Sequence, residues 1–297
     1  MIRKIDSLGN KTVSRHAACY HGAIIPGSRA SFLKEQSARM NFFRRMKTRY
    51  VLRRHALRHG HWQAATGKLW MLDGLSAVEK TRLRKLSTLF LHQKNFVDIG
   101  VPVTQEMRIL IAAQACLPIL NLDSDLLSEW TDIVIYPASF RVTRDEMDRD
   151  GVVHRHEHML SGESWLKGPV VLSWDDIEQD LHTPQNGHNV IIHEIAHKLD
   201  MLDGSSNGLP PLHESRSIPG WATVFSTAYQ QLQKKMEQGQ YTGIHPYAAT
   251  NPAEFFAVSS EYFFCAPAVL HAFSAEVYEN LQSFYRQQPL IRFHAHG

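Results

Sequence analysis

The feature that most constrains this chain is the pattern His-Glu-x-x-His at residues 193–197, inside the stretch NVIIHEIAHKLDMLDG. On a helix, residues four positions apart lie one above the other on the same face. His193 and His197 can therefore direct both imidazoles at one metal ion, and Glu194 projects beside that ion. Metal-assisted hydrolysis of peptide bonds uses this spacing, with the glutamate handling the proton of a water molecule. The pattern predicts a Zn²⁺ site with these two histidines as ligands and Glu194 as the general base.

The residues around this pattern indicate an amphipathic helix. Its apolar positions are Ile191, Ile192, Ile195, Ala196 and Leu199. At 100° per residue, this stripe centres roughly opposite the two histidines, so the helix can pack on its apolar side and present them to a cleft. A chance match is a real risk in a chain with 18 histidines. The other pair at this spacing, His154 and His158 in HRHEH, lies in a polar stretch with little helical pattern, and we interpret it as an exposed segment.

A catalytic zinc site usually has three protein ligands and one open position, so a third ligand is needed. Asp203 follows His197 by six residues, as in extended zinc signatures. Such signatures have a turn-forming glycine where this chain has Asp200, which disfavours Asp203 as the third ligand. We therefore interpret Asp200 as a carboxylate that orients a ligand histidine, or as a helix C-terminal residue. A later helix in YAATNPAEFFAVSSEYFF offers Glu254 and Glu261. These two lie seven residues apart on nearly the same helical face, so the spacing alone does not decide between them.

The order of predicted elements indicates an α+β fold, mainly helical, with a small mixed sheet and the His-Glu-x-x-His pattern on its own helix. Helical periodicity is expected in the ranges 76–93, 188–199, 219–237, 252–264 and 275–286 and from residue 104 onward. The runs DIVIY and PVVLSW read as strands, and the second is either an edge strand that could pair with an extended peptide or a core strand. Residues 141–168 are expected to form loops or a hairpin.

Charge divides the chain unevenly. Residues 1–60 contain 14 of the 32 basic residues but only two acidic ones, Asp6 and Glu35, and the remainder carries 18 basic and 27 acidic residues. We expect residues 1–45 to form a basic N-terminal extension, which can be disordered, ahead of a single domain over residues 46–297. The extension is either a dispensable arm or a segment for anionic partners, and charge alone does not favour direct nucleic-acid binding.

The cysteines and the hydropathy pattern bear on the compartment. Three cysteines with no C-x-x-C pair argue against a disulfide framework and for a reducing compartment, and they leave histidines and carboxylates as metal ligands. The apolar run ILIAAQACLPIL is too short to span a membrane, and the N-terminus lacks the pattern of a signal peptide. We expect a cytoplasmic protein that does not associate with membranes.

Two motifs together carry a resemblance to a known family. HEIAHKLD followed by YAATNPAEFFAVSSEYFF resembles the Mlc titration factor A family of bacterial zinc metallopeptidases, and the similarity extends over roughly residues 70–290. The resemblance implies a zincin-like fold similar to the catalytic domain of anthrax lethal factor. It also implies zinc held by His193, His197 and Glu254, with Glu194 as the general base. The tyrosine of the family falls on Tyr247, whose phenol is implied to donate a hydrogen bond to the developing oxyanion.

The resemblance further implies a function that composition and spacing do not give. Members act as aminopeptidase-type enzymes on peptide or protein substrates. They also bind Mlc, a repressor of glucose-uptake genes linked to the phosphotransferase system. An alternative keeps only the second role, in which the chain sequesters the repressor and its metal site is weak or vestigial.

Overall fold

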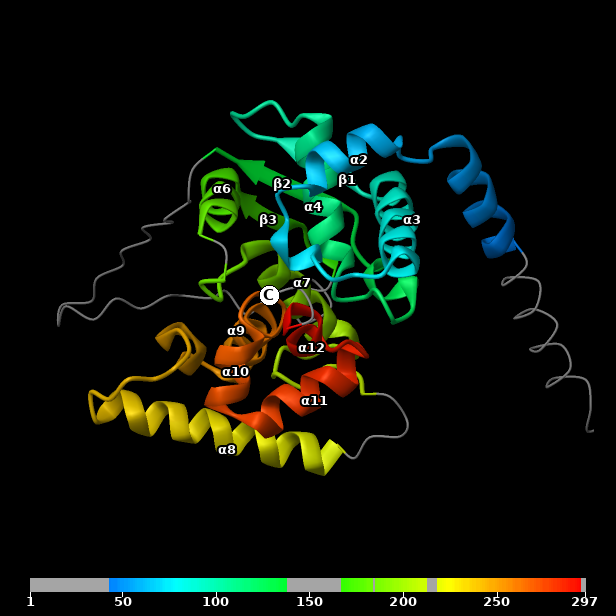
Figure 1. Cartoon of the computed structure of the whole chain (residues 1–297). Helices are drawn as coiled ribbons and strands as arrows, with labels where there is room; N and C mark the ends of the chain where they lie inside the picture. The colour runs from blue at the N-terminus through cyan, green and yellow to red at the C-terminus, as the bar shows by residue number, and fades with distance from the viewer. Residues whose placement is uncertain (1–42, 138–166, 184, 213–217, 295–297) are drawn as a thin grey trace, which may run out of the picture. The chain divides into compact units, whose positions relative to one another are not determined.

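The structure, a computed structural model, describes residues 43–137, 167–183, 185–212 and 218–294 (Figure 1). The chain divides into two units, residues 1–47 and 48–297. The first is described only from residue 43, and residues 43–54 are helical. Residues 141–166, which include the His154 and His158 pair, lie outside the described parts.

Three helices and their caps form the first part of the second unit. The elements are α2 (His59–Thr66), the 3-10 helix η1 (Trp70–Leu72), α3 (Ala77–Gln93) and α4 (Gln105–Cys116). The helix α3 begins with a capping box, in which Ser76 Oγ accepts from Glu79 N at 3.2 Å and Glu79 Oε2 accepts from Ser76 N at 2.8 Å. Such reciprocal bonds satisfy backbone donors that a helix start leaves unpaired. Thr104 caps α4 in the same way. The predicted starts of α3 and α4 are therefore confirmed.

A three-stranded sheet follows the order β1-β2-β3, with β1 (Asn95–Asp98), β2 (Asp132–Tyr136) and β3 (Val170–Ser173). All three strands pair in parallel, with Phe96 beside Ile133 and Ile133 beside Val170. The prediction of a mixed sheet is therefore wrong for the described strands. Parallel neighbours need a crossover connection, and α4 with the 3-10 helix η2 (Ser124–Leu127) supplies the one between β1 and β2. Strand β3 lies at one end of this order.

The second part of the unit is helical. It contains α6 (Trp174–His182), α7 (Val190–Asp200), η3 (Met201–Asp203), α8 (Ile218–Glu237), η4 (Pro246–Ala249), α9 (Pro252–Cys265), α10 (Pro267–Phe273), α11 (Ala275–Tyr285) and α12 (Pro289–His294). The predicted helices near 219–237, 252–264 and 275–286 are confirmed. Figure 1 shows α7 between the strands and the group α8 to α11, and α7 contacts both α4 and α9. The mainly helical α+β architecture is likewise confirmed.

The helix α9 forms the centre of the core. Every residue from Ala253 to Cys265 is buried. Aromatic side chains surround it, with the Phe225 ring 5.8 Å from that of Phe255 and 4.2 Å from that of Trp221, measured between centroids. Burial of each such side chain contributes about 1.5–3 kcal/mol, so α9 is held rigidly against its neighbours. No helix in the described ranges is long and apolar enough to cross a membrane.

Candidate metal centre

The helix α7 presents the two histidines as its sequence predicts. Asn189 caps its start, with Oδ1 accepting from Ile192 N at 2.9 Å. The apolar stripe of α7, residues 191, 192, 195, 196 and 199, is at most 2% exposed and packs into the core. His193 and His197 lie on the other side and are only partly buried. The predicted orientation of the helix is therefore confirmed.

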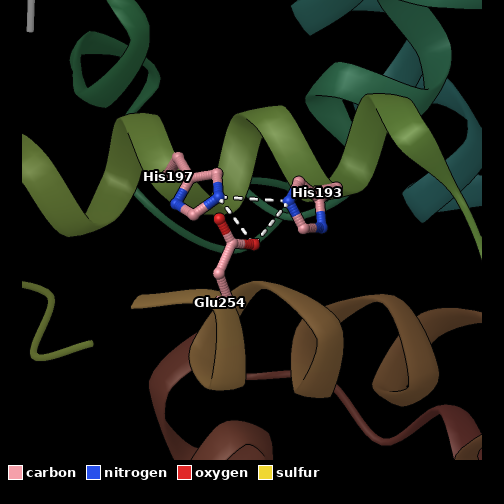
Figure 2. A group of neighbouring side chains, drawn as sticks. All are labelled: His193, His197 and Glu254. Carbon is pink, nitrogen blue, oxygen red and sulfur yellow. Dashed lines mark hydrogen bonds and ion pairs between the residues drawn. The ribbon is translucent and has the colours of Figure 1, made fainter. Parts of the chain in front are cut away.

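Three side chains from two helices converge on one point. The Nε2 atoms of His193 and His197 lie 3.1 Å apart, and Glu254 Oε2 lies 3.1 Å from the first and 3.5 Å from the second. Figure 2 shows Glu254 reaching up from α9 toward the two rings on α7. Within the described parts of the chain, this is the one cluster of three metal-ligand side chains whose ligand atoms all lie within 4.8 Å of one another.

The geometry of these atoms fits a divalent metal ion. Ligand bonds of 2.0–2.1 Å in a tetrahedral arrangement place neighbouring ligand atoms about 3.3 Å apart, close to the three observed separations. The Oε2 atom of Glu254 is buried and makes no hydrogen bond to any residue that the structure describes. A buried carboxylate oxygen without a donor is costly, and a bound cation would remove that cost. Two imidazoles, one carboxylate and an open position form the donor set of catalytic zinc sites.

The start of α9 places Glu254 at this point. Asn251 caps the helix by accepting from Glu254 N at 2.9 Å, and Pro252 occupies the first helical position. The backbone of Glu254 is thus fixed by the cap, while its carboxylate extends to the histidines. The carboxylate of Glu254 therefore contacts His193 and His197 and does not serve only to cap α9.

The other acidic candidates lie elsewhere. Glu261 stands behind His193, with Oε1 2.8 Å from Nδ1 of the ring and Oε2 accepting from Asn189 N at 2.6 Å. Asp203 accepts from Ser205 N at 3.0 Å and is not part of the converging group. Asp200 accepts from Gly208 N at 2.8 Å, so its observed contact anchors a loop. The carboxylate that contacts one of the two histidines from outside the group is that of Glu261.

Electrostatics in the metal-free centre favour an ion pair. Burial opposes protonation of His193, but the neighbouring carboxylates of Glu254 and Glu261 outweigh this effect and raise its pKa to about 10. Burial likewise opposes ionisation of Glu254, yet the two histidines lower the pKa of its carboxyl strongly. These two shifts favour a protonated His193 ring beside an ionised Glu254 carboxylate. Metal binding must displace that proton, because a metal ligand has to be deprotonated.

The loop that follows α7 and η3 contacts both the end of α7 and the start of α9. The backbone of Gly208 donates to Asp200, and its carbonyl accepts from Trp221 Nε1 at 3.0 Å. Gly208 has φ +77°, and a Cβ there would lie 2.4 Å from the carbonyl oxygen of Pro252. A glycine is required at this position, because it allows the loop to approach the first turn that carries Glu254.

The two remaining predicted site residues lie nearby. Glu194 follows His193 directly on α7 and is partly buried. Tyr247 lies on η4, and its ring centroid is 6.1 Å from that of His193. The hydroxyl of Tyr229 donates to the carbonyl of Ala249 at 3.0 Å and so fixes this short helix from the side of α8.

Sequence reasoning missed a polar network that supports the centre. Asn189 Nδ2 donates to Gln114 Oε1 at 2.6 Å, which links α7 to α4. Asp180 of α6 accepts from Val190 N at 2.9 Å and also contacts His188. Gln114 interrupts an otherwise apolar run, and a lone buried amide of this kind signals a required hydrogen-bond partner.

Sequence comparisons match most of this chain to one protein family and to known relatives. The sequence model of the family described as glucose-regulated metallo-peptidase M90 matches residues 43–286. An uncharacterized protein of Synechocystis is 40% identical over 234 residues, covering 78% of this chain and 85% of that protein. Mlc titration factor A of Yersinia pestis, and likewise that of Yersinia pseudotuberculosis, is 38% identical over 226 residues, covering 75% of this chain and 83% of the relative. The chain therefore belongs to the glucose-regulated metallo-peptidase M90 family, the family of Mlc titration factor A.

Proposed function

We propose that this chain is a zinc-dependent peptidase with His193, His197 and Glu254 as metal ligands and Glu194 as the general base. The observation that carries the proposal is the convergence of three ligand atoms, spaced 3.1–3.5 Å apart, around a buried carboxylate oxygen that lacks a hydrogen-bond donor. The family to which the chain belongs consists of metallopeptidases, which supports the assignment.

The roles of the side chains follow from their positions. A zinc ion in such a site polarises a carbonyl and lowers the pKa of water toward about 7. The carboxylate of Glu194, beside the centre on α7, takes the proton of the attacking water and passes it to the nitrogen of the leaving amine. His193 and His197 would hold the ion through Nε2, because the buried stripe fixes the α7 backbone that carries them.

Tyr247 serves in this proposal as the oxyanion donor. Its ring lies beside His193, on a short helix anchored to α8. The phenol donates a hydrogen bond to the substrate carbonyl oxygen as that atom gains negative charge, which lowers the barrier more than it strengthens substrate binding.

The proposed substrate is a peptide, attacked near its N-terminus in aminopeptidase fashion. Strand β3 is the last strand in the order of the described sheet, so an extended peptide could pair with its outer edge. An acetylated peptide would then be cleaved far more slowly than the same peptide with a free amine. Equal rates would indicate an endopeptidase.

The decisive experiment separates metal binding from turnover. Glu194→Gln is expected to keep one zinc per chain, measured by elemental analysis, and to lose peptide cleavage. His193→Ala is expected to lose both. If Glu194→Gln cleaves peptides as fast as the unmodified protein, Glu194 is not the general base and the mechanism fails.

The names of the relatives favour a second candidate function, binding of an Mlc-type transcription repressor. In this alternative the chain regulates sugar-uptake genes by sequestration, and the metal site is weak or vestigial. Capture of such a repressor by the Glu194→Gln variant would separate binding from catalysis. Loss of capture after chelation would connect the two roles.

Location and domain organisation remain predictions. We propose a cytoplasmic protein in which residues 1–45 are dispensable for hydrolysis. Deleting that segment and measuring both peptide cleavage and repressor binding tests this. If both activities survive unchanged, the segment is an arm without a part in either function.

A further inference from the structure

A cavity that shares no lining residue with the metal centre lies where α2, η1 and α3 meet the segment that precedes α2. Its volume is about 600 Å³, within the range of sites that enclose small molecules. All of its lining residues fall between positions 52 and 88, whereas the metal-centre residues fall between 193 and 261. The established features of the family site therefore do not account for it.

The floor of this cavity is apolar and firmly packed. It is formed by Leu57, Trp62, Leu69, Leu72 and Leu83, each at most 8% exposed. These side chains belong to the main hydrophobic core. The floor is therefore part of a rigid structure and does not have to form when a ligand arrives, which lowers the entropic cost of binding.

The rim of the cavity is basic. Lys80, Arg84 and Lys85 project from α3, and Asp73 is the one acidic side chain among the lining residues. Arg84 donates through Nε to the carbonyl of Leu57 at 2.9 Å, with a second bond from Nη2, so its guanidinium is held at the wall. Lys80 and Lys85 are exposed. Cations along one edge of an apolar recess select for a ligand with an apolar body and a negative end.

We propose that this cavity binds a small amphipathic anion, in which an apolar chain covers Trp62 and a carboxylate lies against the α3 cations. The lining elements are helices and their connecting segments, and no described strand edge borders the cavity. An extended peptide therefore lacks the backbone partners that it would need there. A carboxylic acid with an alkyl chain of moderate length can place its chain on the apolar floor and its carboxylate against the basic rim.

The test uses straight-chain acids as probes on the full-length protein. Decanoate should bind saturably by calorimetry and change tryptophan fluorescence, and Trp62→Phe should remove that change. Octanoate should bind roughly fifteenfold more weakly, because it has two fewer methylenes and each buried methylene contributes roughly a factor of four. Decanol and decylammonium, which have the same chain, should bind more weakly than decanoate, with the cation weakest.

Charge variants locate the site. Lys80→Glu with Lys85→Glu should weaken decanoate binding roughly five- to tenfold, as expected for several exposed ion pairs. The matched control is Arg82→Glu with Lys234→Glu, which changes net charge equally at exposed positions outside the cavity lining and should leave the affinity within twofold. Ala56→Trp, at an exposed lining position, should block binding without unfolding the core.

Two results would overturn the proposal. One is the absence of saturable decanoate binding. The other is decanoate binding that the control variant (Arg82→Glu with Lys234→Glu) weakens as much as the cavity variant (Lys80→Glu with Lys85→Glu). Binding of decanol as tight as that of decanoate would likewise contradict the proposal. Peptide cleavage and zinc content are measured in the same samples, and neither enters this test, so failure of the peptidase proposal would leave it intact.

Discussion

Glu261 holds the imidazole of His193 from behind. One carboxylate oxygen lies 2.8 Å from Nδ1 of His193, and the other accepts the backbone N–H of Asn189 at 2.6 Å. In the neutral ring, the form that a metal ligand must take, a Nδ1 proton directed at Glu261 leaves the Nε2 lone pair facing Glu254 and His197. A single buried carboxylate thus fixes the tautomer of one ligand and ties it to the start of α7.

Glu261→Gln should weaken zinc affinity by about 10–100-fold, the usual effect of losing such a partner. An amide has one acceptor oxygen, so it cannot accept from both His193 and Asn189. Affinity is measured by competition with a chromophoric chelator. Asp203→Asn is the matched control, because Asp203 lies close in sequence but outside the ligand group. Equal affinity in both variants would show that Glu261 does not position the histidine.

Sequence patterns were sufficient to predict the helix α7 and the orientation of its histidines, but not which glutamate of α9 joins them. The buried stripe and the Asn189 cap are local features, so periodicity and composition determine them. The choice between Glu254 and Glu261 is different. Both lie on one face of α9, and the packing of α9 against α7 decides which carboxylate reaches the ion. That packing depends on residues far apart in the chain, and only the resemblance to a family favoured Glu254.

The sheet shows a similar limit. Strand β1 (Asn95–Asp98) has one buried side chain, Phe96, and a polar residue at each end, so it lacks the apolar run that would signal a strand. The direction of pairing depends on how the chain crosses between strands, which short apolar runs do not encode. The two longer runs were recognisable because their apolar residues occupy buried positions, such as Ile133 and Ile135 in β2.

Asp200→Asn should change how the stability of the metal-free protein depends on pH. Burial raises the pKa of Asp200 to about 6, and its Oδ1 atom has no donor among the described residues. The usual value is near 3.9, so between about pH 4 and pH 6 the folded state binds more protons than the unfolded state. Stability contributed by this group therefore falls as pH rises through that range.

The asparagine variant removes this ionisation while its amide oxygen can still accept from Gly208. Above pH 6 the variant should unfold at a higher denaturant concentration than the unmodified protein. Its free energy of unfolding should be larger by up to about 2–3 kcal/mol, which corresponds to a pKa difference of about two units. Below pH 4 the two proteins should have the same stability. Denaturant titrations at several pH values measure the difference, and parallel pH curves for the two proteins would contradict the assignment.

Gly208→Ala should displace the first turn of α9. The added Cβ would lie 2.4 Å from the Pro252 carbonyl oxygen, and the residue has φ +77°. The left-handed conformation alone costs about 1–2 kcal/mol for alanine. Gly204→Ala is the control, since Gly204 has φ +93° but no atom within 4 Å of its Cβ position. Both variants should lose stability, but only Gly208→Ala should also lose zinc affinity. Equal affinities would show that the loop does not position Glu254.

Zinc should stabilise the folded protein through Glu254. An ion that binds only the folded state adds about 2.7 kcal/mol when its free concentration is 100 times the dissociation constant. Glu254→Gln should abolish most of this increment, because the neutral amide cannot replace the carboxylate between two imidazoles. Thermal unfolding with and without zinc measures it. Asp203→Asn should keep the full increment, since Asp203 binds Ser205 instead. If Asp203→Asn loses the increment while Glu254→Gln retains it, the third ligand is Asp203, and α9 has no part in holding the ion.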